Sequence, residues 1–236
     1  MADPGIPDSP NRVARTAGVL YLLVVGCGII GAILADVVLV PGDTAASVDR
    51  IMASGFIFRL GYVFLLTRLV FLTLLVLALH KLFGPVNRDV AAAMVAFVLI
   101  SNAVIMVSLV LGYSAPLLLT SSDYSGLYTD EQWLAQVQFF LNLQVQGDRA
   151  AQIFSLWVIL LGFLMLKSGY VPRLLGILMM IAGAGYVADF LVFFFIPQAD
   201  VQIAGYAFLA EVAFPFWLLI KGVDVGVWRS RALGSG

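Results

Sequence analysis

The order of apolar and polar residues along this chain predicts long apolar helices separated by short polar turns. The expected spans cover residues 16–40, 56–83, 90–117, 148–166, 172–196 and 201–220. At about 1.5 Å per residue, each is long enough to cross a hydrocarbon core of about 30 Å. We therefore predict an all-α, polytopic membrane protein, with a single six-helix transmembrane domain over residues 16–221 between tails at 1–15 and 222–236.

Two polar segments predict short amphipathic helices in the outer interface. Residues 43–54 place apolar and charged side chains on opposite sides of a helix. Residues 129–142 open with Thr129 and Gln132 in a capping-box pattern and continue with apolar residues at helical spacing. We expect this second helix to rest on the interface, and Gly147 to admit a bend into the span that follows.

Composition agrees with a membrane protein. The chain is 62% hydrophobic and 11% charged, with a mean hydropathy of +1.03, against about 25% charged residues in soluble domains. No polar block is long enough to form a separate soluble domain, and no basic face suits a nucleic acid. The lipid bilayer is therefore the expected partner, and nucleic acid is excluded.

The distribution of positive charge predicts the orientation. The tails and the turns on one side of the predicted spans hold nine of the thirteen cations, namely Arg12, Arg15, Lys81, Arg88, Lys167, Arg173, Lys221, Arg229 and Arg231. The opposite loops hold mainly Asp and Glu. Because cytoplasmic loops are enriched in Lys and Arg, we expect both termini in the cytoplasm, with the first span uncleaved.

Residue types exclude several kinds of site. Cys27 is the single cysteine and His80 the single histidine, so disulfides, thiolate or bis-histidine metal sites and a Ser-His hydrolase are not expected. The sequence predicts no metal and no cofactor.

A run of small residues in the first span predicts close helix packing. Gly26-Cys27-Gly28-Ile29-Ile30-Gly31 matches a dinucleotide-binding pattern, but that pattern needs a preceding strand. We interpret it instead as a packing face that pairs Gly28 with Ala32 and Gly31 with Ala35.

Polar residues inside the spans are the candidates for function, because an ionised side chain in hydrocarbon needs a partner or a polar cavity. Counting residues from the span ends places Arg68, Glu211 and Asn102 near the midplane. We expect Arg68 and Glu211 to pair, with Asn102 nearby. Pro215 leaves the Glu211 carbonyl without its helical donor, which favours a kink beside the acid.

A second polar layer is expected nearer the outer surface. Its members are Asp36, Arg59, Asp148, Arg149 and Asp189. Both layers admit a purely structural interpretation, because buried ion pairs can simply fix helix register. The functional interpretation is a binding site composed of the two layers.

Several motifs, in order, resemble those of the bacterial DUF4386 family of six-span membrane proteins. They are Arg12 to Tyr21, Val40-Pro-Gly-Asp43, Phe58-Arg-Leu-Gly61, Pro85-Val-Asn-Arg88, Ser168-Gly-Tyr-Val-Pro-Arg-Leu-Leu-Gly176, Tyr186-Val-Ala-Asp189 and Leu218 to Val223. The resemblance covers nearly the whole chain and implies a fold and topology like those predicted above. Because the family is a domain of unknown function, it implies no activity; Thr67-Arg68-Leu69 departs from its usual pattern.

Three functions remain open. We favour a non-enzymatic protein of the bacterial inner membrane, with an outward-opening intramembrane pocket that binds or transports a small or amphiphilic ligand, such as a lipid. A second interpretation is an accessory subunit of a larger complex or homo-oligomer, in which the charges hold helices together. A third is a lipid-acting enzyme that uses the outer Asp and Arg groups as acid, base and headgroup clamp.

Overall fold

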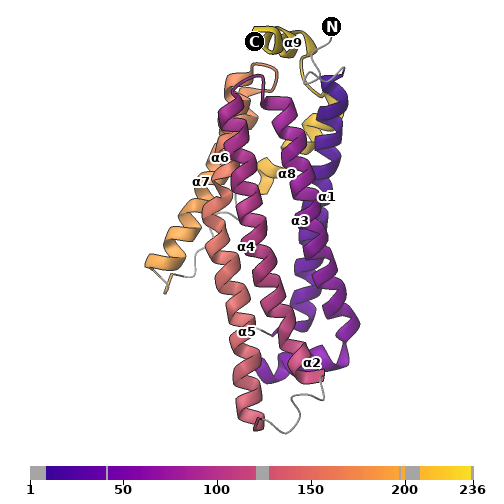
Figure 1. Ribbon diagram of the computed structural model, residues 1–236, viewed down its shortest axis with the longest axis vertical. Helices are drawn as coiled ribbons and strands as arrows, with labels where there is room; N and C mark the ends of the chain where they lie inside the picture. The colour runs from indigo at the N-terminus through magenta and orange to yellow at the C-terminus, as the bar shows by residue number, and fades with distance from the viewer. Residues whose placement is uncertain (1–8, 41, 121–127, 197, 200–207, 235–236) are drawn as a thin grey trace. The chain divides into compact units, whose positions relative to one another are not determined.

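The computed structural model describes residues 9–40, 42–120, 128–196, 198–199 and 208–234, and no strand occurs among them (Figure 1). The helices are α1 (Pro10–Val38), α2 (Thr44–Ala53), α3 (Gly55–Phe83), α4 (Arg88–Thr120), α5 (Asp130–Ala151), the 3-10 turn η2 (Gln152–Ser155), α6 (Leu156–Ser168), α7 (Arg173–Phe195), α8 (Phe208–Ile220) and α9 (Val225–Gly234). The all-α prediction is confirmed in the described ranges.

Five helical stretches are long and apolar enough to cross a membrane. They cover Pro10–Val38, Gly55–Phe83, Arg88–Ala115, Asp130–Ser168 and Arg173–Phe195. Apolar side chains that the protein does not cover, such as Val70 and Ile181, lie on these helices and suit contact with lipid. The sixth predicted span corresponds to α8, whose apolar part, Glu211–Ile220, is shorter; residues 201–207 of that span lie outside the described ranges.

Both predicted tails contain helix, so helical structure extends beyond the predicted spans. Residues 1–8 lie outside the described ranges, and α1 starts at Pro10, six residues before the predicted start. Proline suits the first helical turn because the amide hydrogen it lacks has no partner there. At the other end, α9 forms within the predicted C-terminal tail, where Trp228 is 1% exposed. The buried indole gives this segment the apolar anchor that a solvated tail lacks.

The predicted bend at Gly147 is wrong. Helix α5 passes through Gly147 and ends at Ala151, and the departure from α-helical geometry begins five residues after Gly147, in η2. The capping box that starts α5 is confirmed: Thr129 N donates to Gln132 Oε1 at 3.0 Å, and Gln132 N donates to Thr129 Oγ1 at 3.3 Å. The expected second interfacial helix is therefore the first part of a continuous 39-residue helical stretch. The first predicted segment forms the helix α2, and its place in the interface stays a prediction.

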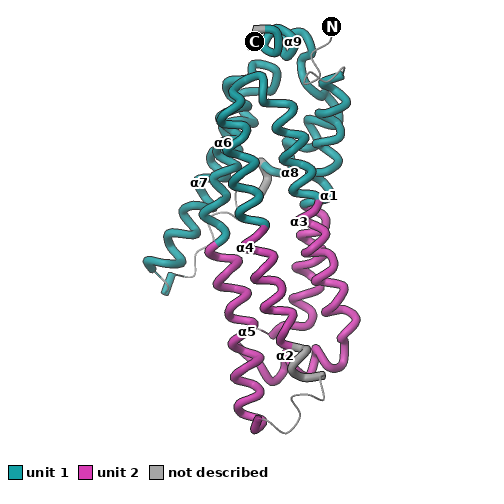
Figure 2. The backbone as a smooth tube through the Cα atoms, in the orientation of Figure 1, with its two compact units in different colours: residues 1–24, 71–102, 151–236 teal, residues 25–70, 103–150 magenta. Residues whose placement is uncertain are grey.

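The chain separates into two compact units (Figure 2). Unit 1 contains residues 1–24, 71–102 and 151–236, and unit 2 contains residues 25–70 and 103–150. The expectation of a single transmembrane domain stays a prediction.

Glycines allow close helix packing inside unit 1. A Cβ added to Gly162 of α6 would lie 2.7 Å from the Gly176 carbonyl oxygen and 2.8 Å from the Met180 nitrogen, both on α7. A Cβ added to Gly183 would lie 2.8 Å from the Ile159 nitrogen. Backbone therefore approaches backbone along this antiparallel hairpin, as small residues permit between membrane helices.

Glycines also allow close packing between α1 and α3 in unit 2. A Cβ on Gly31 would lie 2.8 Å from the Leu65 side chain, and one on Gly61 would lie 3.3 Å from Leu34 Cβ. The predicted small-residue face is confirmed for Gly28 and Gly31, which both lie against α3. It is wrong for Ala32, which is exposed, because the contacting residues recur every three residues (28, 31 and 34) and 32 falls outside that row.

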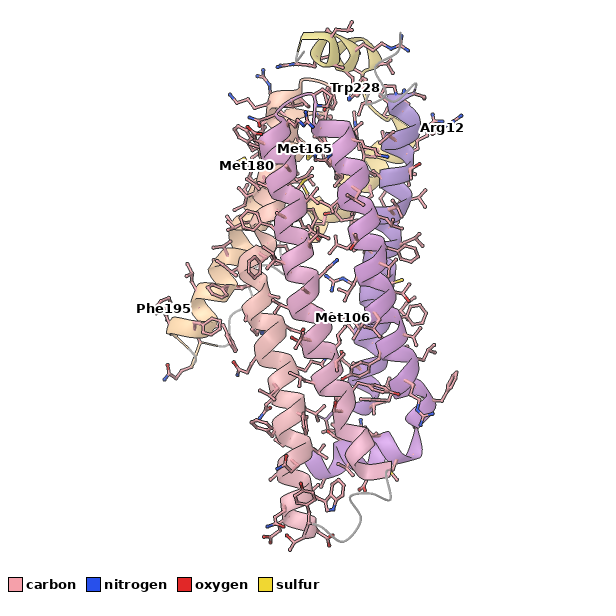
Figure 3. All side chains as sticks on the ribbon, viewed as in Figure 1. Arg12, Met106, Met165, Met180, Phe195 and Trp228 are labelled. Carbon is pink, nitrogen blue, oxygen red and sulfur yellow. The ribbon has the colours of Figure 1, made fainter. Side chains whose placement is uncertain are left out.

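One end of unit 1 is fastened by hydrogen bonds between segments far apart in sequence. The Leu82 carbonyl accepts from Tyr170 Oη and from Trp228 Nε1, both at 2.8 Å. Asn11 Oδ1 accepts from Val223 N at 2.8 Å, which joins the start of α1 to the segment before α9. Figure 3 places Arg12 and Trp228 at this same end of unit 1. The first and last described helices, α1 and α9, are therefore linked within unit 1.

Tyr170 makes the stability of this end dependent on pH. Burial raises the pKa of Tyr170 above its usual range, and Arg231 partly opposes this. An unfolded tyrosine ionises near pH ~10, so the stabilisation is complete below that pH and is lost as the pH rises above it. We expect Tyr170→Phe to cost about 1 kcal/mol at neutral pH, and the difference from the parent to shrink above pH ~10. Chemical unfolding followed by tryptophan fluorescence measures both; a difference independent of pH would contradict this.

Candidate functional site

A polar network crosses the core of unit 2 from α3 to α5. Tyr62 belongs to a buried apolar cluster with Phe58 and Leu109, yet its hydroxyl donates to Gln144 Oε1 of α5. Gly112 of α4 faces this hydrogen bond: a Cβ there would overlap the Gln144 amide and lie 2.6 Å from the Tyr62 hydroxyl. Glycine on α4 therefore leaves the space that the Tyr62–Gln144 contact occupies.

The network continues along α5 to Asp148. The Gln144 side chain hydrogen-bonds the Asp148 carboxylate one helical turn further on. Since Gln144 Oε1 already accepts from Tyr62, its amide NH₂ is the group that donates. Asp148 Oδ1 is buried and has no hydrogen-bond partner within the described part of the chain. One carboxylate oxygen is thus held by the network, and the other is available as an acceptor.

Two arginines of unit 2 act on Asp148. The charges of Arg68 on α3 and of Arg149 on α5 both interact with its carboxylate. The Arg68 side chain packs against α1, where a Cβ on Gly28 would lie 3.3 Å from Arg68 Cδ and 3.5 Å from Nε. A larger residue at Gly28 would displace the guanidinium. We call Tyr62, Arg68, Gln144 and Asp148 the Tyr62 cluster.

Unit 1 holds a second group of buried polar side chains. Tyr21 of α1 is buried, its hydroxyl has no hydrogen-bond partner in the described ranges, and it interacts electrostatically with Glu211 of α8 and Tyr186 of α7. Its ring meets Phe214 edge to face at 6.2 Å. Glu211 is therefore on the side of α8 that faces α1 and α7.

The predicted site residues thus fall into separate groups. Arg68, Asp148 and Arg149 come together in unit 2, whereas Asp36 and Arg59 of the same unit are exposed. In unit 1, Asn102 Nδ2 donates to Thr73 Oγ1 at 2.9 Å, and Asp189 is 4% exposed on α7. Arg68 and Glu211 belong to different units, and their pairing stays a prediction.

Neither of these two tyrosines was predicted as a site residue. Tyr62 and Tyr21 lie within apolar runs and resemble ordinary core aromatics. The available signal was the phenol hydroxyl itself, because a buried tyrosine usually needs a partner for it. Among the described residues, no group of three His, Cys, Asp or Glu side chains could hold a metal ion.

Long apolar helices with polar side chains buried between them define a multi-pass membrane protein. Comparison with known families then places the chain more narrowly. It belongs to the family described as "Domain of unknown function (DUF4386)", whose model matches residues 16–222.

An uncharacterized protein of Archaeoglobus fulgidus is 49% identical over 69 residues. The similarity covers 29% of this chain and 41% of that relative, so the chain matches about two fifths of the relative's length. No solved structure matches the chain.

Proposed function

We propose that this protein crosses a bacterial inner membrane six times, with both termini in the cytoplasm. An even number of spans returns the chain to the side on which it started, and the hydrogen bond from Val223 N to Asn11 Oδ1 joins the start of α1 to the segment before α9. The nine cations of the predicted cytoplasmic segments all belong to unit 1 and are all exposed. The positive-inside rule assigns the segments that carry these cations to the cytoplasm.

The proposed function is to bind or transport a small or amphiphilic ligand at the Tyr62 cluster. The observation that carries it is the Asp148 carboxylate, which has one oxygen in the network and one buried oxygen, Oδ1, available as an acceptor. A buried charged acceptor without a donor costs about 1–3 kcal/mol or more, and a ligand N–H or O–H group would remove that cost. The nearby Arg68 charge allows the ligand also to carry an anionic group.

Native mass spectrometry of the gently extracted protein, with release of its bound molecules, tests this proposal. We expect a small molecule or lipid bound in stoichiometric amount, and about tenfold or greater weakening in Asp148→Asn, because a hydrogen bond to a charged group is lost. Asp49→Asn is the matched control, since Asp49 is an exposed acid of α2. Equal retention in both variants would refute the site.

The same measurement distinguishes ligand binding from the alternative function, that of an accessory subunit. A protein that carries no small molecule but holds a stable partner protein would overturn the ligand proposal. The Tyr62 cluster would then be a structural network of an accessory subunit, and Asp148→Asn would lower the thermal stability of the complex without changing its composition.

A further inference from the structure

Two cations are brought together at the fastened end of unit 1. Arg231 Nη2 of α9 donates to the backbone carbonyl of Lys167, the last basic residue of α6, at 3.0 Å. Both side chains are exposed. The contact uses the Lys167 backbone carbonyl and does not involve the lysine ammonium group. The contact brings the Arg231 guanidinium to the Lys167 backbone, so an anion held by the guanidinium would be within reach of the flexible lysine side chain.

Hydrogen bonds to neighbouring segments hold α9, and with it Arg231, in place. Trp228, three residues before Arg231, is buried and donates to the Leu82 carbonyl. Asp224 Oδ1 accepts from Val227 N at 3.1 Å in the first turn of α9, and Asp224 N donates to Tyr170 O. Helix α9 is therefore anchored on both the turn between α6 and α7 and the end of α3, and a ligand at Arg231 would meet an ordered helix.

Lys167 lies at one end of a helical stretch that is long and apolar enough to cross a membrane. Lys167 is next to the last residue of the spanning stretch Asp130–Ser168, and its Nζ lies 5.9 Å from the centre of the Phe163 ring one turn below. Leu174 and Leu233 are 66% and 79% exposed, which suits contact with acyl chains. Cations at this level with apolar neighbours match a phospholipid better than a soluble anion.

We propose that Lys167 and Arg231 bind the phosphate of an anionic phospholipid headgroup. Arg231 supplies a planar fork of donors and Lys167 a compact charge, a combination that suits a phosphodiester. The negative end of the α6 dipole stabilises the lysine cation at this position. The inference is independent of the ligand proposed for the Tyr62 cluster, which lies in unit 2.

Native mass spectrometry of the full chain in detergent, titrated with dioleoyl phosphatidylglycerol or dioleoyl phosphatidylcholine, tests the proposal. Each cation near an anionic headgroup contributes enough that Lys167→Gln should weaken the first phosphatidylglycerol binding step about fivefold. The double change Lys167→Gln with Arg231→Gln should weaken it about 30-fold. Binding of phosphatidylcholine should stay the same in both variants.

Lys81→Gln is the matched control, because Lys81 is exposed at the last turn of α3 and its loss removes the same charge from the same unit. We expect this variant to bind phosphatidylglycerol like the parent. An equal loss in Lys81→Gln would reduce the effect to general charge attraction and overturn the site. Displacement of the lipid by an equal concentration of inorganic phosphate would overturn the assignment to a phospholipid. Lys167→Gln keeps the carbonyl that Arg231 uses, so misfolding would not imitate the expected result.

Discussion

Gly162→Val is expected to separate α6 from α7 and to lower the stability of unit 1 by about 3 kcal/mol. A Cβ at Gly162 would lie 2.6 Å from Met180 Cγ, 2.7 Å from the Gly176 carbonyl oxygen and 2.8 Å from the Met180 nitrogen. The methionine side chain can turn away, but the two backbone atoms cannot move without shifting the whole helix. Valine adds two further methyl groups at this point, so the overlap exceeds what a local adjustment can absorb.

Gly26→Val is the matched control for this prediction. Gly26 also lies in a long apolar helix, yet a Cβ there meets nothing within 4 Å, so we expect a change within about 0.5 kcal/mol. Thermal unfolding in a mild detergent, followed by tryptophan fluorescence, compares the two variants with the parent. Similar losses from both would mean that valine disturbs any apolar helix here, and the close contact between α6 and α7 would not explain the effect.

Most of the helix boundaries could be predicted because local signals coincide with them. The predicted limits 56–83 and 172–196 agree with α3 and α7 to within one residue at each end, since Gly84-Pro85 and Pro172 interrupt the apolar runs there. The capping box of Thr129 and Gln132 is likewise a local pattern whose hydrogen bonds form within one turn. Such features need no knowledge of the rest of the fold.

The bend predicted at Gly147 does not form, because the structural role of a glycine depends on the residues around it. A Cβ on Gly147 would overlap Ser108 Oγ of α4, so this glycine serves helix packing rather than a turn. Similarly, the polar side of the predicted interfacial helix meets another helix: Thr44 Oγ1 of α2 donates to Gln138 Oε1 of α5. Amphipathic spacing shows which side is polar but does not identify the polar partner.

The candidate site shows the same limit. Residue counting gives the depth of a side chain along its span, and on that basis Arg68 could meet any acid at a similar level. Depth contains no information on which direction the side chain takes around the helix axis. In the structure Arg68 acts on Asp148, an interaction set by the packing of α3 against α1 through Gly28. Choosing among possible partners therefore required the tertiary packing.

The second large effect on stability is expected at α9, a helix that was not predicted from the sequence. Trp228→Ala should release α9 from the end of unit 1 and cost about 3–5 kcal/mol, because it removes a buried indole. The indole is 1% exposed and donates to the Leu82 carbonyl. Amide hydrogen exchange measured by mass spectrometry should show α9 exchanging rapidly in this variant, and trypsin should cleave after Arg229 and Arg231.

Two further variants serve as controls. One distinguishes burial of the indole ring from its hydrogen bond, and the other tests whether any substitution in α9 releases the helix. Trp228→Phe keeps most of the buried ring, and Leu82 O still accepts from Tyr170, so we expect a loss of only about 1 kcal/mol. Leu233→Ala removes a side chain of α9 that is 79% exposed and should leave exchange and cleavage unchanged. If α9 stays protected in Trp228→Ala, the indole is not its anchor. If it is released, the guanidinium of Arg231 leaves Lys167 with it, and binding of phosphatidylglycerol should weaken although no charge has been removed.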